Sequence, residues 1–101
     1  MTYKFTPRIF IDALSLNGVK LSWLVKKHGL SREYFIPRYN EKILRGVKSL
    51  PYNYQKRLND KTIEKIADIL DKSKFFTTKK EDIILCFKNN NFDALLPEDL
   101  L

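Results

Sequence analysis

The chain has 101 residues, of which 44% are apolar and 31% are charged, as is ordinary for one globular domain with a modest core. No apolar run approaches the length of a membrane span, and the first residues lack the basic and hydrophobic regions of a signal peptide, so we expect a cytoplasmic protein. A single cysteine excludes an internal disulfide, and one cysteine with one histidine offers too few soft ligands for a structural zinc site.

The net charge of +7 is concentrated in the middle of the chain. Between Lys20 and Arg57 ten basic residues face two acidic ones, whereas residues 75–101 carry two more acidic residues than basic ones. Four of the five tyrosines fall in the same basic stretch, where a face that only solubilises the protein needs no aromatic residues. This combination predicts a polyanionic partner and favours nucleic acid over a merely solvated face.

Helical periodicity begins near the N-terminus. Thr6 supplies a capping hydroxyl before Pro7, and Asn17-Gly18 provides a left-handed stop, which together predict a helix over residues 7–17.

A second short helix is predicted over residues 20–28, because Leu21, Leu24, Val25 and His28 recur at helical spacing before Gly29. Its outward positions are Lys20, Trp23, Lys26 and Lys27. His28 is expected at a core or boundary position rather than in a functional role.

The stretch SREYFIPRYNEKILRG, residues 31–46, begins with a capping serine but contains a proline. Pro37 inside a helix costs about 3 kcal/mol, so one straight helix is not expected. We predict that Ser31 caps a short turn whose Phe35 enters the core, and that a new helix runs from Pro37 to Arg45. Two registers remain open for the residues that face a partner. Either the helix after Pro37 presents Arg38, Asn40 and Lys42, or the first piece presents Ser31, Arg32, Glu33 and Tyr34.

Two further helices are predicted in the second half of the chain. Asn59 or Asp60 caps one of them, along which a single apolar stripe runs. Thr78 with Glu81 forms a capping box that opens the last helix, which the run of asparagines at 89–91 ends. No segment alternates in the manner of a strand, so the expected fold is an all-α, compact bundle of about five helices.

The stretch LVKKHGLSREYF, residues 24–35, resembles the helix-turn-helix of the phage Cro and repressor family, whose pattern is Leu-Ala-x-x-x-Gly-Ile-Ser-x-x-x-Ile. ILRG at 43–46 and KTIEKIADIL at 61–70 are similar to the end of that family's recognition helix and to its following core helix. The resemblance covers residues 19–70. The chain departs from the pattern at two places. Five extra residues, IPRYN, follow Phe35, and the link YNYQKRL after Leu50 is longer than usual. The matching positions are Leu24, Gly29, Leu30, Ser31 and Phe35, with Val25 in place of alanine.

The resemblance implies a lambda-repressor-like fold and a sequence-specific double-stranded DNA-binding protein, a small transcriptional repressor or regulator of a phage or mobile element. Arg and Lys can bond guanine, Asn can pair with adenine, and Tyr can contact phosphate or a thymine methyl. The candidates for base reading are Arg32, Tyr34, Arg38, Tyr39, Asn40 and Lys42. The candidates for backbone contacts are Lys20, Trp23, Lys26, Lys27, Ser31, Arg45 and Lys48.

Residues 1–75 are expected to form the helix-turn-helix unit, and residues 76–101 to add a helix and an apolar tail. That tail must pack on the same domain or on a dimer partner, and homodimers are usual for repressors of this type.

An alternative reading keeps the helical scaffold and makes the chain an adaptor or inhibitor that binds another protein through its aromatic and basic surface. RNA binding is a weaker option, since no stacking-sheet motif occurs. An enzyme is not expected, because the only histidine lies in a predicted helix among lysines, and no Gly-rich phosphate loop or spaced set of carboxylates appears. Cys86 falls in an apolar stripe and is expected in the core. Neither a catalytic residue nor a metal or other cofactor is expected.

If the helix after Pro37 reads bases, Asn40→Ala should relax discrimination at one base position at a cost of roughly 1–3 kcal/mol. Lys27→Ala should instead weaken binding to all sequences alike. Selection from a random duplex pool measures both effects, and equal loss across sequences for Asn40→Ala would remove Asn40 from the reading set.

Overall fold

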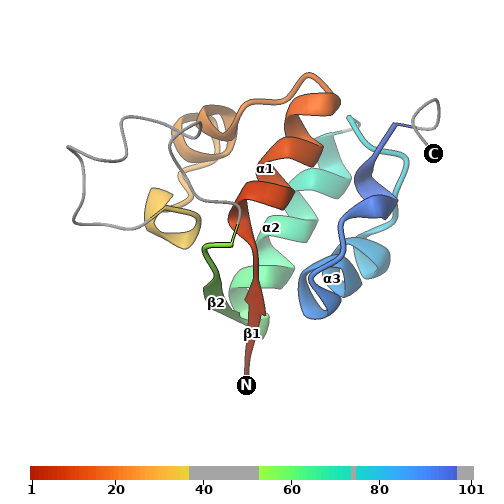
Figure 1. Cartoon of the computed structure of the whole chain (residues 1–101). Helices are drawn as coiled ribbons and strands as arrows, with labels where there is room; N and C mark the ends of the chain where they lie inside the picture. Colours follow the sequence, from red (N-terminus) through yellow and green to blue (C-terminus); the bar gives the residue numbers. More distant parts are fainter. Residues whose placement is uncertain (37–52, 74, 98–101) are drawn as a thin grey trace.

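A computed structural model describes residues 1–36, 53–73 and 75–97 of the chain (Figure 1). The element order in the described part is β1 (Thr2–Phe5), α1 (Pro7–Leu16), η1 (Trp23–Lys27), η2 (Arg32–Tyr34), β2 (Lys56–Asn59), α2 (Asp60–Ser73), α3 (Lys80–Asn89) and η4 (Asp93–Leu95). η1 is a π-helix, and η2 and η4 are single turns of 3-10 helix. Figure 1 shows α3 on one side of α1 and the short helices η1 and η2 on the other.

The expectation of an all-α, lambda-repressor-like bundle of five helices is wrong, because β1 and β2 form an antiparallel two-stranded sheet. Thr2 lies opposite Asn59 and Phe5 opposite Lys56. Each strand has four residues and one fully buried side chain, Phe5 or Leu58, which is too little for an alternating pattern to appear in the sequence. The partners are also far apart in the chain, so local periodicity carries no signal of their pairing.

Five of the seven phenylalanines form the centre of the core. They come from β1, α1, the segment after η2, α3 and the segment after α3, and they are Phe5, Phe10, Phe35, Phe87 and Phe92. The rings of Phe10 and Phe35 stack with centroids 5.5 Å apart, and those of Phe10 and Phe87 are 4.9 Å apart. Such pairs add about 0.5–1.5 kcal/mol each beyond the area that they bury.

The three α-helices lie close to where their patterns predicted them. α1 begins at Pro7 and ends before Gly18, whose φ of +76° is the left-handed conformation expected there. Asn59 caps α2, since its side chain accepts a hydrogen bond from the Thr62 N–H at 2.9 Å. Asn90, at φ +51°, ends α3. The predicted stripe of α2 is buried, and it consists of Ile63, Ile66, Ala67 and Leu70.

Thr6 is the N-cap residue of α1, as predicted, but its hydroxyl makes no capping hydrogen bond, and the predicted cap at Thr78 is wrong because Lys79 holds that position in α3. Tertiary contacts use both hydroxyls. Asn90 donates to the Thr6 hydroxyl at 3.1 Å and accepts the Thr6 N–H at 2.7 Å, which joins the ends of α1 and α3. Thr78 donates to the carbonyl of Ala94 at 2.6 Å instead of opening α3.

The described part of the C-terminal tail packs on the chain's own core. Phe92 and Leu95 are buried, and Leu96 packs against the same cluster. Asn17, at the end of α1, donates to the carbonyl of Leu95 at 2.6 Å. The apolar tail residues as far as Leu96 are therefore packed within one chain. Homodimerisation stays a prediction that these residues do not support.

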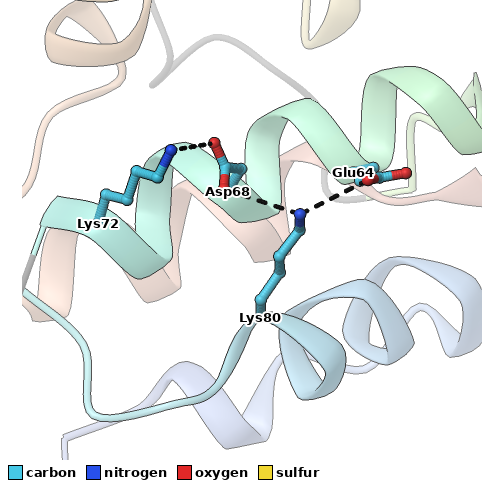
Figure 2. A network of polar contacts seen from close by, with 4 residues as sticks. All are labelled: Glu64, Asp68, Lys72 and Lys80. Atoms are coloured by element: carbon cyan, nitrogen blue, oxygen red, sulfur yellow. Dashed lines mark ion pairs between the residues drawn. The ribbon is translucent and has the colours of Figure 1, made fainter.

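Ion pairs join α2 to α3 on the outer surface (Figure 2). Lys80 Nζ lies 3.5 Å from Glu64 and 3.7 Å from Asp68, and Lys72 Nζ lies 3.0 Å from the other oxygen of Asp68. The hydrogen bond from Lys72, with the positive charges of Lys72 and Lys80, holds the pKa of Asp68 below its ordinary value of 3.8.

A carboxyl group whose pKa is lower in the folded state stabilises the fold above its unfolded pKa, and that contribution disappears as the pH falls through the folded pKa. Asp68→Asn should therefore reduce stability at pH 7, and its difference from wild type should shrink below about pH 4. Urea denaturation at several pH values measures this. Asp71→Asn is the control, because Asp71 is exposed on the same helix without an ion pair in the described part; an equal effect would contradict the assignment.

Candidate nucleic-acid interface

A tight turn joins η1 to η2 and orients the basic segment. Gly29 adopts φ +67°, a conformation that side chains strongly disfavour, and the N–H of Leu30 donates to the carbonyl of Leu24 at 3.2 Å. Leu24 and Leu30 are both buried, which anchors the two sides of the turn in the core.

The segment after the turn behaves as the sequence predicted. Ser31 caps η2, since its hydroxyl accepts a hydrogen bond from the Glu33 N–H at 3.2 Å. η2 contains only one turn, after which Phe35 and Ile36 are both buried. The exposed side chains that this turn offers to a partner are those of Arg32 and Glu33.

The helix predicted over residues 20–28 is present in altered form. Its centre, Trp23–Lys27, is a π-helix, which is rare in proteins and frequent at functional sites. A periodic apolar pattern cannot distinguish this helix from an α-helix, because the two differ by one residue in a single turn. His28 was expected at a core or boundary position, but the residue is exposed at the end of η1, with its ring 4.5 Å from that of Trp23.

The cations that precede Glu33 around this turn lie in an interval of the sequence without acidic residues. No acidic residue occurs between Asp12 and Glu33. Four basic side chains in this interval are exposed and form neither an ion pair nor a side-chain hydrogen bond in the described part of the chain, and they are Lys20, Lys26, Lys27 and Arg32.

On α2 and α3, by contrast, cations lie among carboxylates. Lys72 and Lys80 pair with α2 carboxylates, and Lys88 lies 3.4 Å from Asp60. The face of η1 and η2 therefore carries positive charge that no ion pair balances within the described residues. The sheet residues Lys4, Lys56 and Arg57 form no ion pair there either.

A groove of about 300 Å³ opens on the same face. Trp23 and Phe75 line it, with their rings edge to face and 5.4 Å between centroids, and three lysines border it. The full lining is Gly18, Val19, Lys20, Ser22, Trp23, Lys26, Lys27 and Phe75. Phe75 was not among the residues predicted from the sequence; the only signal was a pair of adjacent phenylalanines after α2, of which Phe76 is buried and Phe75 is 52% exposed.

The structure brings part of the predicted site together. Lys20, Trp23, Lys26 and Lys27 all line the groove, and Trp23 also packs on the core as a half-buried residue. Tyr34 is half-buried, with its ring 6.3 Å from that of Phe35. The candidates that lie outside the described residues are Arg38, Tyr39, Asn40, Lys42, Arg45 and Lys48.

Other kinds of site have little support in residues 1–36, 53–73 and 75–97. No group of three His, Cys, Asp or Glu side chains is placed to hold a metal ion there. None of the helices in these ranges is both long and apolar enough to span a bilayer.

Comparison of the chain with protein-family models, with curated protein sequences and with solved structures finds no match. The resemblance of residues 19–70 to the helix-turn-helix family therefore remains a prediction that rests on the sequence of those residues.

Cys86 is buried in α3, as predicted, and burial raises the pKa of its thiol to about 11, with a smaller contribution from Asp82. Below that pH the reactive thiolate is scarce, so native protein at pH 8 should react with iodoacetamide far more slowly than unfolded protein. Mass spectrometry should find one label per chain in guanidinium and almost none without it. Rapid labelling of the native protein would indicate an accessible, activated thiol.

Proposed function

We propose that the protein binds double-stranded DNA through the face formed by η1, the Gly29 turn and η2. The observation that carries this proposal is a set of four exposed cations, Lys20, Lys26, Lys27 and Arg32, that form no ion pair within the described part of the chain. No carboxylate occurs in the sequence from residue 13 to residue 32, directly before Glu33. Lysines and arginines that neutralise phosphates release counterions, which is the main source of affinity for DNA. A regulator of transcription in a phage or mobile element is the role that the helix-turn-helix resemblance suggests for such binding.

The turn geometry supports this use of the face. A helix, a glycine with positive φ, a buried leucine and a serine cap follow one another between Leu24 and Ser31, as they do in a helix-turn-helix. The lysines of η1 then occupy the first element of the motif, where phosphate contacts position a protein on the duplex.

This proposal assigns base reading to residues 37–45 together with Arg32. η2 supplies few side chains for a groove, because it is one turn long, Tyr34 is half-buried and Phe35 is buried. Of the two registers that the sequence left open, the longer segment after Pro37 therefore has the stronger case, with Arg38, Asn40 and Lys42 as its reading residues.

Changing both Lys26 and Lys27 to alanine should weaken duplex binding at all sequences and reduce the slope of log K against log salt by about 2, roughly 1 per lost phosphate contact. Fluorescence anisotropy with a labelled duplex at several salt concentrations measures affinity and slope together.

The matched control changes Lys61 and Lys65 to alanine. These two lysines are also exposed, but they lie on α2 among four acidic residues, so the slope should change much less. Equal slopes for both double variants, or no duplex binding even at low salt, would refute the proposal. Tighter binding to single-stranded RNA than to duplex DNA would move the assignment to RNA.

A further inference from the structure

The groove beside η1 has a chemical character that duplex DNA does not use. Its border is cationic, from Lys20, Lys26 and Lys27, and its inner wall is aromatic, from Trp23 and Phe75. A DNA backbone can pair with the lysines, but its deoxyribose rings are held between charged phosphates and carry no bulky apolar side chain that could enter the groove between the two rings. A ligand that contacts both the lysines and the two rings must carry both negative charge and an apolar side chain.

Phe75 is the exposed aromatic residue of this groove. Its neighbour Phe76 is turned into the core, whereas Phe75 remains 52% exposed with one ring contact, to Trp23. Burial of a phenylalanine side chain is favourable, and aromatic side chains in pockets are frequent hot spots of protein interfaces. The volume of about 300 Å³ lies at the lower end of the range for binding pockets, and is suited to one side chain with its flanking backbone.

We propose that this groove binds a short acidic segment of a partner protein that carries a bulky apolar side chain. The apolar side chain packs against Trp23 and Phe75, and carboxylates on either side pair with the ammonium groups of Lys20, Lys26 and Lys27. Charge complementarity argues for an acidic partner, because the three lysines have no ion-pair partner within the described part of the chain and no carboxylate lines the groove.

Peptide binding and DNA binding share the three lysines, so the acidic segment competes with duplex DNA for this face. This regulatory consequence rests on the proposed function, whereas the binding of the peptide does not. A partner with such a segment would remove the protein from DNA by occupying the phosphate-contacting lysines.

The test uses the full chain and the peptide acetyl-Glu-Asp-Leu-Phe-Glu-Asp-amide. Trp23 is the only tryptophan of the chain and lines the groove, so its fluorescence reports binding directly. A second peptide with Ser-Ser in place of Leu-Phe keeps the charge and removes the apolar group. We expect the first peptide to change Trp23 emission in a saturable manner, and to bind at least about tenfold more tightly than the second.

Phe75→Ala should weaken binding of the first peptide about tenfold or more. Leu85→Ala is the matched control, because Leu85 is exposed to the same degree, 51%, and lies on α3 outside the groove. Both positions are on the surface, so both variants should stay folded, which circular dichroism checks. In both variants, peptide binding is measured by the change in Trp23 fluorescence.

Failure of the first peptide to bind, equal affinity for the two peptides, or equal losses in Phe75→Ala and Leu85→Ala would each overturn the proposal. Duplex affinity tests the proposed function separately. Phe75→Ala should leave duplex affinity within about twofold of wild type, since it removes no charge. Saturable peptide binding without duplex binding would refute DNA recognition and leave the peptide site standing; the reverse result would refute the peptide site alone.

Discussion

The packing of five phenylalanines on one another is the interaction on which the rest of this fold depends. Phe5, Phe10, Phe35, Phe87 and Phe92 bring together a strand, two helices and two irregular segments, and all are at most 2% exposed. Removing one buried phenylalanine side chain typically costs about 3–5 kcal/mol, a large part of the stability of a small domain. Phe35 has a second effect, because it fixes the segment after the Gly29 turn against α1, with the stacked ring of Phe10 5.5 Å away.

The surface is divided by the way in which its charges are balanced. On α2 and α3 the carboxylates of Asp60, Glu64 and Asp68 neutralise lysines of the same or the neighbouring helix. Around η1 the lysines face solvent and form no ion pair within the described residues, so that counterions or an anionic partner would relieve their mutual repulsion. Both proposed ligands use this imbalance. They differ in the apolar contact, since the pair of Trp23 and Phe75 can contribute to a peptide complex but adds little to a phosphate contact.

The errors of sequence interpretation share one physical cause, which is that long-range contacts override local preference. Thr6 and Thr78 have the residue type of helix caps, yet their hydroxyls bond to Asn90 and to the carbonyl of Ala94. The strands were missed because each has only four residues and a partner more than fifty positions away. Of the candidate site, the lysines of η1 were predicted by their outward positions, but Phe75 was not, since nothing in the sequence distinguishes it from its buried neighbour Phe76.

The sequence by itself determined the three α-helices, the left-handed end at Gly18, the end of α3 within the asparagine run, the Ser31 cap and the outward position of the η1 lysines. These features follow from local periodicity, backbone sterics and side-chain hydrogen bonds to nearby amides. Only the tertiary structure decided the β1–β2 pairing, the docking of Phe92 and Leu95 on their own core, and the groove between η1 and Phe75. Each of these features joins residues that are distant in the chain. Whether a side chain is buried there depends on which other segments pack against it.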